Sequence, residues 1–293
     1  MPNNPQNPRS KSSPRPQRLA PRYDPQRGDA PPEMIPLVEA SWILKALAAV
    51  FAVALLCSYL TLCALFSHGQ WQLVLHPSHT VDATPASLNL LFTEVHFGVD
   101  SSGLPQLDGW WIPASTPTGA PTPRTILILH AADGSISNAL PAAQLLHAQN
   151  LNVLLFDYRG YGHSLSPYPD QHPTEASMQS DAATALTYLT TTRAIPASSI
   201  AVYATGLGAP LAVQLCAQNP TLPALILQSP DGDLADRIRH DPRAKLVPFT
   251  LLFNEPFSLT VPLSTLTTPK LTLTTPPNPT TLTQFLTTHL TSH

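Results

Sequence analysis

Charged residues are scarce in this sequence of 293 residues. Asp, Glu, Lys and Arg make up 11% of the chain, against roughly 25% in a typical soluble domain. Hydrophobic residues make up 43%, so the low charge does not indicate general disorder. The charge is also unevenly divided, because residues 1–45 carry a formal +3 and the remainder −6. This balance excludes the broad basic surface that is typical of a nucleic-acid-binding domain.

Cysteine is equally scarce. Cys57 and Cys63 lie in a long apolar segment, and Cys216 lies in a helix-like run. Three cysteines so placed exclude the disulfide framework of small secreted domains. We predict no cofactor and no metal site. Asp231, Asp233 and Asp236 lie close together, but the start of a solvated helix accounts for them without a metal.

Proline is abundant, with 34 residues concentrated at the two ends of the sequence. Residues 1–41 are rich in Pro and Arg and show no apolar period, so we predict a disordered tail. The run at 14–22, PRPQRLAPR, resembles a polyproline ligand. A partner protein that binds this tail is therefore one functional hypothesis.

The longest apolar run follows this tail. Ala46–Phe66 contains 21 residues without a formal charge, which at about 1.5 Å per residue spans a hydrocarbon core of roughly 30 Å. We predict a transmembrane helix over residues 42–66; a buried core helix and a cleavable signal peptide are the alternatives. Seven Lys and Arg residues precede the run, and the next one after it is Arg124. This asymmetry predicts a single-pass protein with a cytoplasmic N-terminus and an extracytoplasmic folded domain from residue 67 to 293.

Short apolar runs alternate with longer amphipathic ones beyond residue 90, which predicts parallel strands joined by crossover helices. The first two strands, joined by a segment with Gly103, are predicted to form an antiparallel hairpin. The predicted strands are 91–99, 107–112, 125–130, 151–157, 199–204, 224–228 and 270–274, and the predicted helices are 138–149, 174–192, 207–218, 234–240 and 281–289. In such a sheet the ligand site lies at the carboxyl ends of the parallel strands.

Five motifs carry a resemblance to a known family. They are WQLVLHPS at 71–78, LDGWWIPA at 107–114, ILILHAADG at 126–134, LLFDYRGYGHS at 154–164 and LILQSPDGDL at 225–234. In combination they resemble the α/β-hydrolase superfamily, in its membrane-anchored branch of serine aminopeptidase-like proteins and lipid esterases. The resemblance implies a mostly parallel α/β-hydrolase sheet with flanking helices. We expect it to be C-terminally truncated, with low regularity in the Thr- and Pro-rich end from about residue 260.

The resemblance also locates the catalytic positions. A serine hydrolase of this fold carries its nucleophile in a G-x-S-x-G turn between a strand and a helix. The turn here is Ala204-Thr205-Gly206-Leu207-Gly208, so glycine stands at the nucleophile position. Asn278 aligns with the acid, and asparagine lacks the charge that stabilises an imidazolium. No base follows at the usual spacing, because His289 and His293 are too close to Asn278.

Other elements of the family's site are retained. The resemblance implies an oxyanion-hole remnant at the backbone N–H groups of Leu207 and Ala131. It also matches the family-motif residues His130, Asp157, Gly160, Gly162, Ser164 and Gly208. For His130 and Ser164 a structural role in the loops is the simpler interpretation, and Thr205 in the turn is not expected to replace the nucleophile.

Three functional hypotheses remain. The leading one is a catalytically inactive membrane protein that binds a lipid, acyl or peptide-like ligand, or a partner, in the remnant pocket. The second is an esterase-like or lipase-like hydrolase with a rearranged active site. The third is an interaction protein whose work lies in the Pro-rich tail.

Overall fold

The computed structural model describes residues 39–115, 124–164, 172–274 and 278–290. The predicted disordered tail lies almost entirely outside these residues, as does His293. The chain divides into two compact units, residues 1–57 and 58–293. Each unit is described below by itself.

The apolar run forms the single helix α1, Ala40–Gly69, which is longer than predicted at both ends. It is the one described helix long and apolar enough to cross a membrane. None of its residues is buried, and side chains such as Leu47 and Phe51 are more than 60% exposed. A core helix would bury these side chains, so the structure does not support that alternative. A membrane anchor and a signal sequence both fit the observation.

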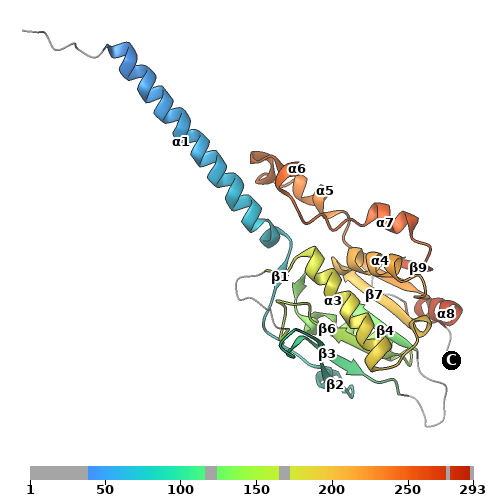
Figure 1. The fold of residues 1–293 in the computed structure, drawn as a ribbon. Helices are drawn as coiled ribbons and strands as arrows, with labels where there is room; N and C mark the ends of the chain where they lie inside the picture. Colours follow the sequence, from blue (N-terminus) through green and yellow to red (C-terminus); the bar gives the residue numbers. More distant parts are fainter. Residues whose placement is uncertain (1–38, 116–123, 165–171, 275–277, 291–293) are drawn as a thin grey trace, which may run out of the picture. The chain divides into compact units, whose positions relative to one another are not determined.

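The folded unit is built on a seven-stranded mixed sheet with strand order β2-β3-β6-β4-β7-β8-β9 (Figure 1). β2 pairs antiparallel with β3, and β3 antiparallel with β6, whereas the other neighbours pair parallel. The strands are β2 Thr93–Val99, β3 Pro105–Ile112, β4 Thr125–Leu129, β6 Asn152–Phe156, β7 Ile200–Gly206, β8 Leu225–Pro230 and β9 Lys270–Leu273. A separate two-residue pair, β1 His76–Pro77 with β5 Asp133–Gly134, lies outside this sheet.

Helices cover both faces of the sheet. Leu127 and Leu129 of β4 share one apolar cluster with residues of α3 and α4, whereas Ile126 and Ile128 share a second cluster with residues of α2 and α8. Alternate residues of a strand point to opposite faces, so β4 contributes to two cores. The helices of these layers are α2 Leu140–His147, α3 Glu175–Thr187 with a π-helical turn Tyr188–Thr192, α4 Gly208–Gln218 and α8 Pro279–His289.

Short helices fill the connection between β8 and β9, which we name the cap segment (residues 231–269). It contains α5 Leu234–Arg239, a 3₁₀ turn Ala244–Leu246, α6 Phe249–Leu252 and α7 Thr260–Thr265. The remaining 3₁₀ turns are Gln70–Leu73, Pro85–Leu88, Ile136–Ala139 and Ala197–Ser199.

All seven predicted strands and all five predicted helices are present, with ends within three residues except where α3 continues as a π-helical turn. The expectation of low regularity after residue 260 was wrong for α7, whereas α8 had been predicted as a helix. Pro262 lies in the first turn of α7 and Pro279 is the first residue of α8, where a missing N–H costs no helical hydrogen bond.

We predict that Leu127→Ala lowers the free energy of unfolding by about 2–5 kcal/mol, because Leu127 is completely buried in the central strand. Leu91→Ala is the matched control, since Leu91 is 84% exposed. Chemical denaturation of the full chain in detergent measures both variants. Equal losses would contradict the assigned core.

Candidate functional site

The nucleophile turn has the backbone geometry that the sequence predicts. β7 ends at Gly206, Leu207 caps the following helix, and α4 begins at Gly208. Gly206 has φ +52°, a left-handed conformation that L side chains rarely adopt. Glycine adopts it without strain, so the sharp strand-to-helix turn persists without a side chain at its centre.

Gly208 fixes the turn against the neighbouring strand. A Cβ atom at this position would lie 2.4 Å from the Leu129 carbonyl oxygen and 2.7 Å from that of His130. No side chain fits there, which explains why the second glycine of the motif is retained. Ala204, whose methyl group replaces the usual first glycine, is completely buried beside β4 and is accommodated.

The space beside Gly206 faces a carboxylate. An ideal Cβ on Gly206 would lie 3.0 Å from the Ala131 Cβ and 3.3 Å from Asp231 Oδ2. The Asp231 N–H donates to the Gly206 carbonyl at 3.1 Å, and Arg237 Nη1 lies 2.8 Å from Asp231 Oδ1. Ala131 therefore borders the turn. Asp231 was predicted to belong to a solvated helix start. Its pair with Arg237 is exposed there, and its Oδ2 also lies beside the position where a side chain on residue 206 would begin.

The neighbouring acids are bound elsewhere. Asp233 Oδ1 accepts hydrogen bonds from the N–H groups of Leu259 and Thr260, which lie at the far end of the cap segment. A hydrogen bond from the Thr260 side chain, together with these two backbone bonds, holds the pKa of Asp233 below its ordinary value. Asp236 pairs with Arg239 at 3.4 Å. Within the described ranges no group of three or more His, Cys, Asp and Glu residues is placed to hold a metal ion.

A buried His–Asp pair lies behind the turn. His130 Nε2 is 3.7 Å from Asp157 Oδ1, and both side chains are almost completely buried. His130 Nδ1 lies 2.7 Å from the Ala131 carbonyl oxygen, so it donates there and Nε2 carries no proton in the neutral ring. Burial lowers the pKa of His130 to about 4 and raises that of Asp157 to about 7.

Asp157 organises the loop that follows β6. Its Oδ1 accepts the Ile136 N–H at 2.7 Å, and its carbonyl oxygen accepts the Ser164 hydroxyl at 2.6 Å. A Cβ on Gly162 would lie 1.8 Å from Asp157 Oδ2, so only glycine fits that position. Gly160, with φ +85°, occupies the same loop. These motif residues hold the loop together, which agrees with a structural role for His130 and Ser164.

Asn278, which aligns with the acid, and His289, which is too close to it to be the base, both have structural roles. Asn278 is the N-cap of α8, and its side chain accepts the Thr280 N–H at 3.0 Å. This is an ordinary capping role for asparagine. His289 lies in the last turn of the same helix and packs against Phe285, with ring centroids 4.9 Å apart.

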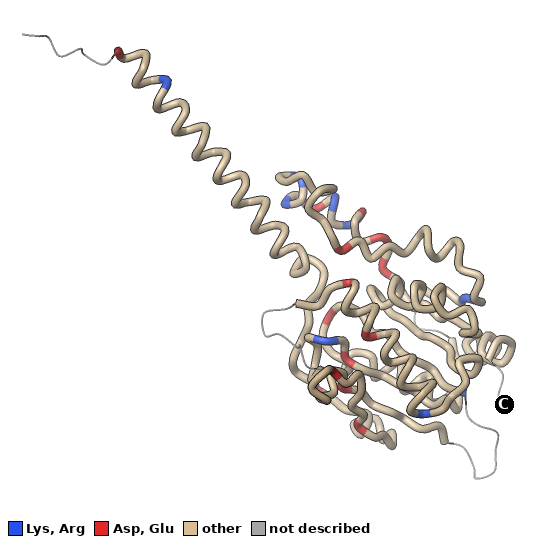
Figure 2. The backbone as a smooth tube through the Cα atoms, viewed as in Figure 1, with Lys and Arg blue, Asp and Glu red and all other residues tan. Residues whose placement is uncertain are grey.

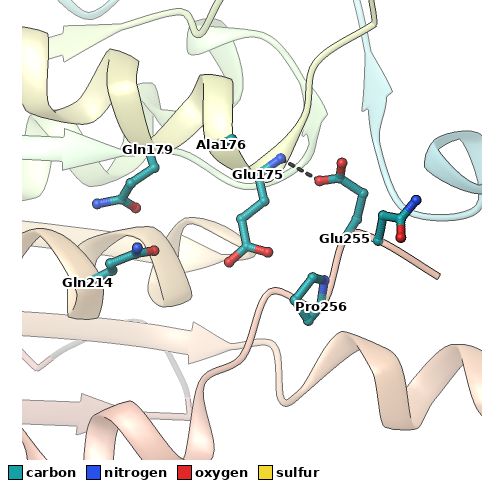
Figure 3. Close-up of a pocket in the computed structure, with 7 residues that line it drawn as sticks. Glu175, Ala176, Gln179, Gln214, Glu255 and Pro256 are labelled. Carbon is teal, nitrogen blue, oxygen red and sulfur yellow. Dashed lines mark hydrogen bonds between the residues drawn. The ribbon is translucent and has the colours of Figure 1, made fainter. Parts of the chain in front are cut away.

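An open pocket lies beside the cap segment (Figure 3). Its volume is about 490 Å³, and it is bounded by the start of α3, the middle of α4 and residues 254–256. Glu255 Oε2 accepts the Glu175 N–H, and burial raises the pKa of both carboxyl groups. The lining residues are Glu175, Ala176, Gln179, Gln214, Asn254, Glu255 and Pro256.

Comparison with known proteins identifies the family of the chain. The model of the family Hydrolase_4, described as serine aminopeptidase, S33, matches residues 120–287, which is more than half of the chain. The chain belongs to this family. The match includes the nucleophile turn, the cap segment and the position of Asn278.

Curated relatives match over shorter stretches. An uncharacterized protein of Mycobacterium tuberculosis is 34% identical over 131 residues, which is 45% of this chain and 43% of that protein. Protein bem46 of Schizosaccharomyces pombe is 35% identical over 39% of this chain and 37% of its own length. The alpha/beta hydrolase domain-containing protein WAV2 of Arabidopsis thaliana is 29% identical over 54% and 49%. The matches thus span about half or less of these relatives.

Solved structures share the fold. An α/β hydrolase from Vibrio vulnificus has a TM-score of 0.54 at 22% identity, with 72% of this chain and 75% of that one covered. An esterase from Pyrococcus furiosus, Pf2001, has a TM-score of 0.53 at 17% identity, with 74% and 100% covered. At these identities the likeness concerns the fold alone.

The sequence did not predict the position of Asp231 beside Gly206 or its ion pair with Arg237. The motif LILQSPDGDL identified its loop, but the ion pair with Arg237 depends on how α5 turns back, and no local pattern encodes that turn. The cavity beside Glu175 was missed for the same reason, since its walls come from three distant segments.

We predict that Asp157→Asn becomes progressively more stable relative to the unaltered protein as the pH rises from 5 to 8. The folded-state pKa of about 7 exceeds the ordinary value of 3.8, so Asp157 contributes most below pH 4 and loses that contribution as the pH rises through 7. Asparagine does not ionise, whereas His130 titrates in both proteins. Melting temperatures of the full chain in detergent at both pH values measure the difference.

Asp241→Asn is the control for this experiment. The pKa of Asp241 is lowered to about 2 by its hydrogen bonds with Arg243, so the difference between this variant and the unaltered protein is flat from pH 5 to 8. A difference for Asp157→Asn that is equally flat would contradict the raised pKa.

Proposed function

We propose that this protein is a membrane-anchored member of its family that binds a ligand or partner and does not cleave it. Gly206 is the observation that carries the proposal, because the position that supplies the nucleophile has no side chain. Asn278 as a helix cap and the buried His130 support the same conclusion, since neither is available as an acid or a base of a triad.

The proposed ligand is peptide-like, among the lipid, acyl and peptide-like classes that the sequence leaves open. A cavity of about 490 Å³ has the size of a small-molecule site. Its carboxylates and amides, such as Glu175, Glu255 and Gln214, bind N–H donors and ammonium groups better than an acyl chain. This lining favours an amine-bearing or peptide-like ligand.

The proposed anchor is α1. Its apolar side chains are exposed over a length that spans a bilayer. The Lys and Arg residues in front of it favour a cytoplasmic N-terminus and an extracytoplasmic domain. A partner of the Pro-rich tail would then act on the cytoplasmic side.

The alternative function is an esterase-like hydrolase with a rearranged site. Asp231 favours it, because its Oδ2 lies 3.3 Å from the Cβ position of Gly206. A carboxylate so placed could accept a proton from an attacking water molecule. Its other oxygen, Oδ1, is paired with Arg237 Nη1 at 2.8 Å.

We predict that Gly206→Ser restores no reactivity toward a fluorophosphonate, because a serine without an acid and a base is not activated. The substitution also lowers the free energy of unfolding by about 1–3 kcal/mol, since a side chain at φ +52° is strained. Gly206→Ala is the matched control and has the same effect on stability. Labelling of the serine variant, and not of the alanine variant, would reveal a base that the proposal denies.

We predict that Asp231→Asn does not change the rate at which the full chain hydrolyses p-nitrophenyl butyrate. With the unaltered protein and with the variant, p-nitrophenol is released at the rate measured in buffer alone. Its effect on stability is below about 1 kcal/mol, because the pair with Arg237 is well exposed. Asp233→Asn is the control, since the Asp233 carboxylate accepts hydrogen bonds from the N–H groups of Leu259 and Thr260 and is not directed at Gly206. Activity that is lost only with Asp231→Asn would establish the rearranged hydrolase.

A further inference from the structure

The base of α1 and the cap segment form one apolar groove. Leu62, Leu65 and Phe66 of the helix line it together with Leu246 and Val247 of the cap segment, and its volume is about 390 Å³. Phe66 packs edge-on against Phe249, with ring centroids 6.4 Å apart. All of these residues belong to the compact unit 58–293.

Gln70 holds the cap segment at this place. Its Nε2 donates to the Leu252 carbonyl oxygen at 3.1 Å, and its Oε1 accepts the Asn254 N–H at 3.2 Å. Gln70 is buried, with only 5% of its surface exposed. Residues 246–254 are therefore fixed beside the last turns of the apolar helix.

The outer surface of this part of the cap segment is apolar and basic. Leu246 is 62% exposed and Leu251 is 77% exposed. Four of the eight Lys and Arg residues that follow the apolar run lie between 237 and 245, as Figure 2 shows in blue along α5 and the turn after it. Asp236 and Asp241 are the acidic residues of the same stretch, and they pair with Arg239 and Arg243. The stretch keeps a net positive charge.

The rest of the folded domain has the opposite charge. Outside residues 234–253, the chain after the apolar run carries four Lys and Arg residues against twelve Asp and Glu residues. An anionic surface therefore attracts the stretch 234–253 and repels the remainder of the domain. Exposed leucines beside basic residues are typical of segments that lie in the headgroup region of a membrane.

We propose that residues 243–251 lie on the bilayer that α1 enters, with an anionic phospholipid in the groove. The acyl chain would pack against Leu62, Leu65 and Leu246. The headgroup phosphate would lie at Arg243, which also lines the groove, and at Lys245, two residues further along the chain. This inference rests on the proposed anchor. It adds an orientation, because the cap segment then faces the lipid and the sheet faces away from it.

The test uses the full chain in nanodiscs, with p-benzoylphenylalanine replacing Leu246. The discs contain phosphatidylcholine alone or with phosphatidylglycerol, and mass spectrometry identifies the adducts after illumination. We expect lipid adducts at position 246 and none at the control position 91, because Leu91 is equally apolar and 84% exposed but does not line the groove. In the discs with phosphatidylglycerol, the double substitution Arg243→Glu and Lys245→Glu lowers the yield about fivefold or more.

Three outcomes would overturn the proposal. They are equal lipid labelling at positions 246 and 91, adducts to a second copy of the chain, and protein that copurifies with the discs without a lipid adduct at position 246. Failure of the chain to copurify with any disc would instead overturn the proposed anchor α1, which distinguishes that failure from a missing lipid contact at the cap segment. Unchanged melting temperatures of the substituted proteins exclude misfolding as the cause of a lost adduct.

Discussion

The close approach of α4 to the end of β4 is the contact on which the site depends. Gly208 leaves no room for a Cβ atom next to the Leu129 carbonyl oxygen, and this contact fixes where β7 must end and α4 must begin. The strand-to-helix turn thus follows from backbone packing and needs no catalytic side chain. A nucleophile can be lost at Gly206 while the surrounding fold is retained, because the constraint lies two residues further on.

The same separation of frame and chemistry recurs around the turn. Asp157 organises its loop through the Ile136 N–H and the Ser164 hydroxyl, and Gly162 leaves room for its carboxylate. His130 is buried against the rings of Tyr158 and Tyr161. These residues match family motifs because the sheet edge requires them, so their retention is evidence for the fold and not for hydrolysis.

Much of the fold could be predicted from the sequence. The runs at 125–129, 152–156 and 200–206 are apolar on both faces, which is the pattern of buried parallel strands, and the structure confirms them. α7 could not be predicted, because the Thr and Pro residues in it have low helix propensity. The hydrogen bond from the Thr260 N–H to Asp233, which fixes its first turn, joins residues 27 positions apart and leaves no local sequence pattern. The missing nucleophile at Gly206 could be predicted from the sequence. The position of Asp231 beside Gly206 could not, because it depends on the path of the cap segment.

Hydrolysis by the unaltered full chain is the measurement that tests the account most directly. An aminoacyl p-nitroanilide and a p-nitrophenyl ester are each followed with and without fluorophosphonate pretreatment. The account predicts rates equal to buffer in all four reactions, because Gly206 offers no group for acyl transfer. Turnover that fluorophosphonate abolishes would contradict it and require a serine nucleophile elsewhere in the chain.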